Sequence, residues 1–189
     1  MQLKMLDLFS GLGGASMAMK DHGWEITSID NCSSFNPTIV ADLTTYKPVG
    51  QFDLIWASPP CTDFARWAMP LSFGPRRIPD MRLLLSTLEI IDSLKPRFWI
   101  IENVRGARAW FKPYLSLPTH VIGPYNFWTN ILNLQKLRRA EFSEGKGKWK
   151  LSPSPLRPAL RSKIPYAISK VVAMKVEEVI YTEKVIESG

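Results

Sequence analysis

The chain has 189 residues, of which 46% are hydrophobic and 22% are charged, and this composition excludes a disordered chain and suits a single domain spanning residues 1–189. No apolar run is long enough to cross a bilayer and the first residues lack the form of a signal peptide, so we expect a cytoplasmic protein with no membrane partner. The net charge of +7 favours a polyanionic partner.

Strand-like and helical segments alternate along the chain. We expect strands over residues 3–9, 24–29, 52–57 and 97–101, and an extended segment over 120–131. A turn at residues 10–14 should open a helix that runs to about residue 21, and we expect further helices over 80–94, 104–114 and 165–180. Loops are expected over 30–51 and 59–79. This alternation predicts an α/β fold of the Rossmann-like type, with a mostly parallel sheet and helices on both faces.

A glycine-rich turn, DLFSGLGG at residues 7–14, joins the first predicted strand to the first helix. Glycines there let the backbone approach a ligand closely. Asp30 ends the second strand, where a carboxylate can bind ribose hydroxyls, and Asp42 can accept a hydrogen bond from an exocyclic amine. The acid at Asp7 disfavours a pyrophosphate and suits a cationic cofactor such as S-adenosylmethionine. The alternative is a set of ordinary loop glycines beside two solvated carboxylates.

The segment Ser58-Pro59-Pro60-Cys61-Thr62 follows the strand predicted over residues 52–57. Ligands bind at this edge of open α/β sheets. The two prolines stiffen the turn, and a stiffly held thiol suits a nucleophile, although a lone cysteine can also be a packing residue. Cys61 and Cys32 are the chain's two cysteines, and without clustered histidines they predict neither a disulfide scaffold nor a metal site.

Three motifs resemble those of the cytosine-5 DNA methyltransferases and occur in the same order as in that family. They are DLFSGLGG at 7–14, ASPPCTDF at 57–64 and IENV at 101–104. A fourth segment, IPYAI at 164–168, more loosely resembles the family's last helix motif. The resemblance implies methyl transfer from S-adenosylmethionine to carbon 5 of a cytosine flipped out of DNA. It implies that Cys61 is the nucleophile, that Glu102 holds ring nitrogen 3, and that Asn103 and Pro60 support the site. The cofactor pocket that it implies is lined by Asp7, Phe9, Ser10, Gly11, Gly13, Gly14, Asp30, Asp42 and Pro59.

The implied reaction explains these residue types. A thiolate that adds to carbon 6 of cytosine turns the ring into an enamine, which can attack an electrophilic methyl group. A protonated Glu102 stabilises the developing charge, which requires burial to raise the carboxyl pKa. The ordinary thiol pKa is about 8.5, so the site must favour the thiolate. Taken alone, Glu102 could instead cap the next helix.

The chain departs from the family pattern in three places. Only a short basic segment, residues 132–163, stands where the family carries a target-recognition region, and it is too short for an independent domain. The strand near residues 121–128 lacks the arginine that reaches the cytosine carbonyl, so Asn126 is an alternative contact. Pro165-Tyr166 replaces the usual Gly-Asn of the last motif. The remaining candidates for nucleic-acid contacts, which could also be solvated surface charges, are Arg66, Arg76, Arg77, Arg138, Arg139, Arg161 and Lys163.

Three functions agree with these observations. The first is a minimal DNA cytosine-5 methyltransferase. The second is a non-catalytic module that binds DNA or a protein partner. The third is the same chemistry on RNA, single-stranded DNA or a cytosine nucleotide. In each case a partner subunit or self-association can supply recognition that the short basic segment does not.

Overall fold

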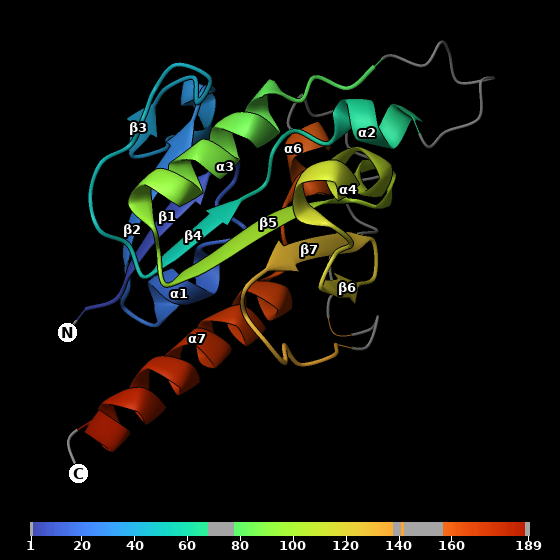
Figure 1. Ribbon diagram of the computed structural model, residues 1–189. Coiled ribbons are helices and arrows are strands. Elements are labelled where there is room, and N and C mark those ends of the chain that lie inside the picture. Colours follow the sequence, from blue (N-terminus) through green and yellow to red (C-terminus); the bar gives the residue numbers. More distant parts are fainter. Residues whose placement is uncertain (1, 68–77, 138–140, 142–156, 188–189) are drawn as a thin grey trace.

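The structure, a computed structural model, describes residues 2–67, 78–137, 141 and 157–187. Within these residues the chain forms a seven-stranded sheet (Figure 1). The strands are β1 (Lys4–Leu8), β2 (Glu25–Asp30), β3 (Ile39–Val40), β4 (Leu54–Ala57), β5 (Phe98–Val104), β6 (His120–Ile122) and β7 (Tyr125–Thr129). Their order is β3-β2-β1-β4-β5-β7-β6. The first five are parallel, and β7 is antiparallel to both β5 and β6, which confirms the predicted, mostly parallel sheet.

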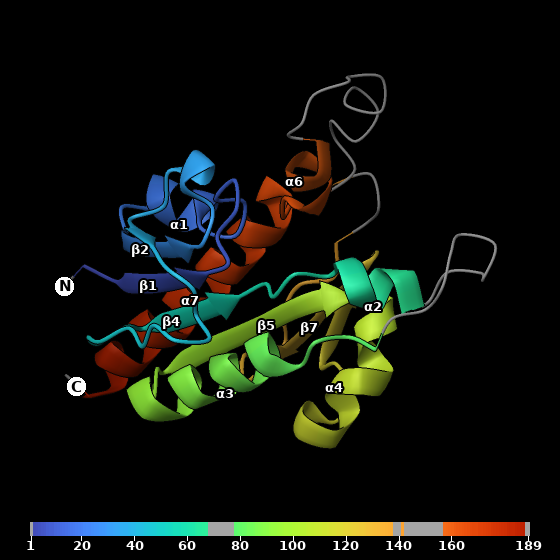
Figure 2. The same ribbon diagram turned by 90° about the horizontal axis from the view of Figure 1, so that it is seen from above.

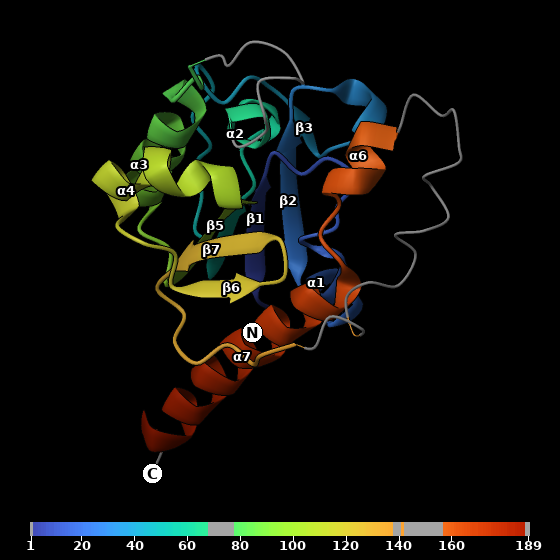
Figure 3. The ribbon, with the colours of Figure 1, turned by 90° about the vertical axis from the view of Figure 1, so that its right-hand side faces the viewer.

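Helices cover both faces of the sheet, as predicted (Figures 2 and 3). They are α1 (Met17–Asp21), α2 (Thr62–Trp67), α3 (Arg82–Leu94), α4 (Arg108–Leu115), α6 (Arg157–Ser162) and α7 (Tyr166–Glu187), with 3-10 turns η1 (Ser33–Phe35) and η3 (Arg105–Ala107). Among the described helices, none is long and apolar enough to cross a membrane.

Two apolar clusters hold these layers together. On one face, Met19 of α1 and Val172 of α7 belong to a buried cluster with Trp56 of the sheet. On the other face, Leu84 of α3 and Phe111 of α4 belong to a second cluster. Its strand residues, such as Ile55, adjoin those of the first cluster in sequence, because successive side chains of a strand point to opposite faces. Because both faces are buried, the central strand β4, with the sequence LIWA, is apolar throughout and does not alternate with polar residues.

The chain reverses direction across the sheet next to β1. It runs from β1 outward through β2 to β3, and then returns to place β4 on the other side of β1. In open α/β sheets a crevice forms at the carboxyl ends of the strands at such a switch point, and ligands bind there. The motifs at residues 7–14 and 57–64 both follow strands that flank this point.

Two expectations for the middle of the chain were wrong. The predicted loop over 59–79 contains helix α2, which forms because Phe64 buries its ring against Phe111 at a centroid distance of 5.1 Å. The strand predicted to end at Ile101 continues to Val104, because β7 pairs with its last residues. Glu102 and Asn103 therefore lie inside β5 and not after it.

Two further expectations needed correction toward the C-terminus. The extended segment over 120–131 is a hairpin of β6 and β7, turning at Gly123 and Pro124, where Gly123 has a φ of 58°. A two-residue hairpin turn favours glycine at such a positive φ. The last helix, α7, continues to Glu187 and so runs past the predicted end at residue 180 (Figure 1).

Candidate active site

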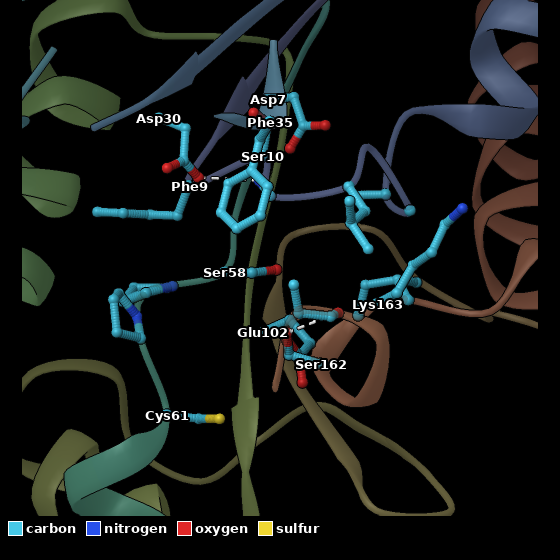
Figure 4. A pocket seen from close by; sticks show the side chains of 18 of the residues that line it. Asp7, Phe9, Ser10, Asp30, Phe35, Ser58, Cys61, Glu102, Ser162 and Lys163 are labelled. Atoms are coloured by element: carbon cyan, nitrogen blue, oxygen red, sulfur yellow. Dashed lines mark hydrogen bonds between the residues drawn. The ribbon is translucent and has the colours of Figure 1, made fainter. Parts of the chain in front are cut away.

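One large cavity opens at the carboxyl ends of β1, β2, β4 and β5. Its volume is about 830 Å³, which is within the usual range of sites for cofactors and small molecules. Figure 4 shows that the cavity has two ends: Asp7, Ser10 and Asp30 lie at one, and Cys61 and Glu102 at the other.

The first end is built by the backbone of the glycine-rich turn. Phe9 has a φ of 60° and Gly11 a φ of 50°, both in the left-handed region. This conformation is uncommon for a bulky residue such as Phe9 and is held here by neighbouring contacts. The Ser10 amide donates to the Ile29 carbonyl at 3.1 Å, and the Gly11 amide donates to Oδ2 of Asp30 at 2.9 Å. The turn is therefore tied to β2 on both sides of Ser10.

Asp7 is a buried carboxyl at this end, with 1% of its surface exposed. The hydroxyl of Ser16 donates to its Oδ2 at 2.7 Å. Burial raises the pKa of Asp7 to about 7; the Ser16 hydrogen bond opposes that rise, and the charge of Asp30 adds to it. A carboxyl that titrates near neutral pH can ionise when a cationic ligand group arrives beside it.

The other two carboxylates are fixed by local hydrogen bonds. Asp30 accepts the Cys32 amide on Oδ1 at 2.9 Å, in addition to the Gly11 amide on Oδ2. Asp42 accepts the amide and the hydroxyl of Thr44, both at 2.8 Å, and these bonds hold the pKa of Asp42 below its usual value. Asp42 therefore offers the cavity a charged, oriented acceptor.

The segment before α7 closes one side of the cavity. A Cβ atom added at Gly14 would lie 2.6 Å from both the backbone nitrogen and the backbone oxygen of Ile164, and 2.7 Å from Cγ of Lys163. Such distances are too short for any other residue type unless the backbone moves. Gly14 thus permits direct packing of the glycine-rich turn against the last motif, and Lys163 and Ser162 line the cavity there (Figure 4).

The second end is built around Cys61. This residue is half-buried and directly precedes α2, where the Ala65 amide donates to its carbonyl at 2.8 Å. The Asn103 side chain donates from Nδ2 to the Pro59 carbonyl at 2.9 Å, and the Ser58 amide donates to the Leu8 carbonyl at 3.2 Å. The cysteine loop is therefore attached to both β5 and β1. Figure 4 shows the sulfur pointing into the cavity.

Glu102 enters the same cavity from β5, and 8% of its surface is exposed. Strand β5 lies beside β4, whose following loop carries Cys61. A thiol and a carboxyl from neighbouring strands thus border one space, and the glycine-rich turn borders the other end of it (Figure 4).

Most of the site residues predicted from the sequence line this cavity. They are Asp7, Phe9, Ser10, Gly11, Gly14, Asp30, Asp42, Pro59, Pro60, Cys61, Glu102 and Lys163. Gly13, with a φ of 66°, shapes the turn, and Asn103 holds the cysteine loop through Pro59. Arg76, Arg77, Arg138 and Arg139 lie outside the described residues, and for Arg66 and Arg161 only their places in α2 and α6 are described.

The structure does not bring Asn126 to the cavity with the other candidates. The register pairs Asn126 with Asn103 and Phe127 with Glu102, so the side chain of Asn126 lies on the opposite face of the sheet from Glu102. There it is buried, and its Oδ1 accepts a hydrogen bond from Nε of Arg108 at 2.5 Å. Asn126 faces away from the cavity because the hairpin turn sets where β7 begins and therefore which of its residues face the cavity.

Sequence reasoning also missed several lining residues, among them Phe35, Tyr125 and Ser162. Tyr125 could have been found by strand alternation, if the hairpin turn at Gly123 and Pro124 had been recognised. Phe35 lies five residues after Asp30, in the segment that follows β2. The path of this segment cannot be predicted from its sequence. Ser162 belongs to the basic segment, where no periodic pattern indicates a helix.

Comparison with known proteins identifies relatives of this chain. The family described as C-5 cytosine-specific DNA methylase matches residues 3–110. A probable DNA (cytosine-5)-methyltransferase of Frog virus 3 (isolate Goorha) is 28% identical over 139 residues, covering 65% of this chain and 63% of the viral protein. The type II methyltransferase M.HgiGI of Herpetosiphon aurantiacus is 30% identical over 131 residues, covering 56% of this chain and 94% of that protein.

A third relative shows how much longer some of these proteins are. The type II methyltransferase M.NgoFVII of Neisseria gonorrhoeae is 30% identical over 118 residues, which is 54% of this chain and 30% of that protein. This chain therefore spans less than two thirds of the length of the viral and the gonococcal relatives.

Proposed function

The chain belongs to the family of C-5 cytosine-specific DNA methylases, and from this premise we propose that it transfers a methyl group from S-adenosylmethionine to carbon 5 of cytosine in DNA. The observation that carries the proposal is the shared cavity: Cys61 and Glu102 border one end of it and the glycine-rich turn borders the other. A nucleophile, an acid and a cofactor pocket must adjoin for this reaction to occur.

The residues at the glycine-rich end fit S-adenosylmethionine. Asp7 would face the positive charge of the ligand, Asp30 and Asp42 would accept hydrogen bonds from its hydroxyl and amine groups, and the ring of Phe35 offers a flat apolar wall for a purine. When bound, this cofactor supplies an electrophilic methyl group attached to a sulfonium. The absence of a Cβ at Gly14 lets the turn pack directly against Ile164, which closes one side of the cofactor pocket.

The residues at the other end would activate the base. The thiolate of Cys61 forms a bond to carbon 6 of cytosine, and the electron pair of the double bond between carbons 5 and 6 becomes available at carbon 5. Glu102, protonated, donates its proton toward ring nitrogen 3 and so neutralises the charge that develops there. After carbon 5 has gained the methyl group, it loses its proton to a base, and the bond between sulfur and carbon 6 breaks so that the thiolate of Cys61 leaves. The proton on ring nitrogen 3 returns to Glu102, which regenerates the acid.

Asn103 acts in this scheme as a positioning residue. Its hydrogen bond to the Pro59 carbonyl connects β5 to the cysteine loop, so that Cys61 and the neighbouring Glu102 keep a fixed separation. The two prolines remove backbone freedom from the same loop. Such preorganisation reduces the entropy lost when the thiol, the base and the acid are aligned.

Lys163 lines the cavity, and a cytosine inside a duplex must leave the stack to enter it. We propose DNA as the substrate, with Lys163 and the arginines predicted above as candidate phosphate contacts. We also propose that a partner subunit or self-association completes target recognition, because the basic segment over 132–163 is short.

The test is a transfer assay with tritium-labelled S-adenosylmethionine. Duplex DNA, single-stranded DNA, RNA and dCMP are offered separately, and the products are analysed for 5-methylcytosine. We expect labelled 5-methylcytosine in DNA. Label in RNA or dCMP alone would replace DNA by that substrate, and cofactor binding with no label in any arm would reject the enzyme and favour a binding module.

A further inference from the structure

We propose that the hydroxyl of Tyr125, in β7, donates a hydrogen bond to the carbonyl oxygen of the cytosine held by Glu102 and so contributes to recognition of the base. This inference rests on the proposed function. It assigns a substrate contact to a strand that contains no arginine, lysine or histidine in its sequence Tyr125-Asn126-Phe127-Trp128-Thr129.

The first support is the register of β5 and β7. Tyr125 pairs with Val104, and Phe127 pairs with Glu102. Directly paired residues of antiparallel strands project from the same face, so Tyr125 and Glu102 are diagonal neighbours on one face of the sheet. Both line the active-site cavity, together with Val104 and Pro124.

The second support is electrostatic. Burial, and next the nearby charge of Glu102, raise the pKa of Tyr125 well above its usual value. The phenol therefore keeps its proton at any pH at which the enzyme is expected to work, and a protonated phenol can donate a hydrogen bond.

The third support is that Tyr125 has a fixed position. Asn126 donates from Nδ2 to the carbonyls of Pro124 at 3.1 Å and Asn103 at 3.3 Å, which ties the start of β7 to β5. Arg108 in turn donates to Oδ1 of Asn126 at 2.5 Å. Tyr125 also packs against Phe127, with ring centroids 6.5 Å apart. Asn126 and Arg108 therefore act as positioning residues for the tyrosine and lie on the other face of the sheet.

The chemistry of cytosine completes the inference. Its exocyclic amine, ring nitrogen 3 and carbonyl oxygen lie side by side on one edge of the ring. A carboxyl that holds nitrogen 3 leaves the adjacent carbonyl oxygen without a donor, and a buried acceptor without a donor weakens binding. Tyr125 lines the cavity beside Glu102, and its hydroxyl can supply the donor for that oxygen. As charge develops on the ring during attack by Cys61, the same hydrogen bond becomes stronger.

The test compares wild type with Tyr125→Phe, which keeps the ring and removes the hydroxyl. The matched control is Tyr114→Phe, because Tyr114 is an exposed residue on α4. The substrates are the DNA that the wild type methylates best and the same DNA with 2-thiocytosine at the target, since sulfur is a poor hydrogen-bond acceptor. Thermal melting and S-adenosylhomocysteine binding verify that each variant is folded.

We expect Tyr125→Phe to lower kcat/KM on cytosine by about ten- to a hundredfold and to lose most of the wild-type preference for oxygen over sulfur. Tyr114→Phe should match the wild type. Unchanged kcat/KM in Tyr125→Phe would overturn the inference, and so would lower activity with the oxygen preference intact, because that pattern indicates a structural role. A wild type that transfers no methyl group at all would instead reject the proposed function, and the inference with it.

Discussion

The two ends of the cavity are built in different ways. The glycine-rich end is shaped by backbone: left-handed φ angles at Phe9 and Gly11, and a contact at Gly14 that leaves no room for a side chain. The end near β5 presents reactive side chains, Cys61 and Glu102, on a loop and a strand that hydrogen bonds hold in place.

This difference implies different sensitivities to mutation. Side-chain changes at the second end should remove chemistry and leave the fold and cofactor binding intact. Changes at the first end should alter cofactor binding and stability, because they disturb backbone packing or a buried charge. Four substitutions test this division.

Cys61→Ser should lower methyl transfer by at least about ten-thousandfold, because a serine hydroxyl is a far weaker nucleophile than a thiolate. The measurement is tritium transfer to DNA, with cofactor affinity followed by calorimetry and expected to stay near the wild-type value. Cys32→Ser is the matched control, because Cys32 is also half-buried and should retain activity. Substantial transfer by Cys61→Ser would refute the nucleophile assignment.

Glu102→Gln should lower kcat by about a thousandfold, because an amide cannot deliver a proton to ring nitrogen 3. The fold and cofactor affinity should not change, since the two side chains have nearly the same shape. Glu89→Gln is the control, because Glu89 is an exposed residue whose carboxylate pairs with Lys47. If both variants have the same kcat, Glu102 is not the acid.

Asp7→Asn should change the pH dependence of stability. The pKa of Asp7 rises from 3.8 to about 7 on folding, so the folded chain binds the proton more tightly than the unfolded chain. This contribution is fully present below pH 4 and is lost as pH rises toward 7, a decrease of roughly 4 kcal/mol across that window. Urea unfolding between pH 4 and 8 should show this decline in the wild type and a flatter profile in Asp7→Asn. If the free energy of unfolding of the wild type and of Asp7→Asn changed with pH in the same way, the raised pKa of Asp7 would be contradicted.

Gly14→Ala should weaken cofactor binding and lower the free energy of unfolding by about 1–3 kcal/mol, because its Cβ would collide with the Ile164 backbone. Gly23→Ala is the control: Gly23 has a φ of 80° and open space around it, so only backbone strain of about 1 kcal/mol is expected. Calorimetry with S-adenosylhomocysteine should separate the two. Equal cofactor affinity in both variants would mean that contact between the turn and residue 164 does not shape the pocket.

Much of the fold was predictable because its signals are local. Apolar runs such as residues 52–57 and the helical spacing over 80–94 predicted a strand and a helix close to those observed. The motif at 7–14 predicted a ligand-binding turn because glycine and acid occur together after a strand. Helix α2 was missed because its formation depends on Phe64 packing against Phe111, which is distant in sequence.

Patterns of a few adjacent residues predict the order of the elements, the glycine-rich turn, and a cysteine and a glutamate near the carboxyl ends of two strands. It is the folded arrangement that places Tyr125, and not Asn126, at the cavity. Side chains of a strand alternate between faces, so a one-residue difference in register exchanges the two. The register of β7 is set by its hairpin turn at Gly123 and Pro124 and by pairing with β5, and this pairing between distant segments is not visible from local sequence.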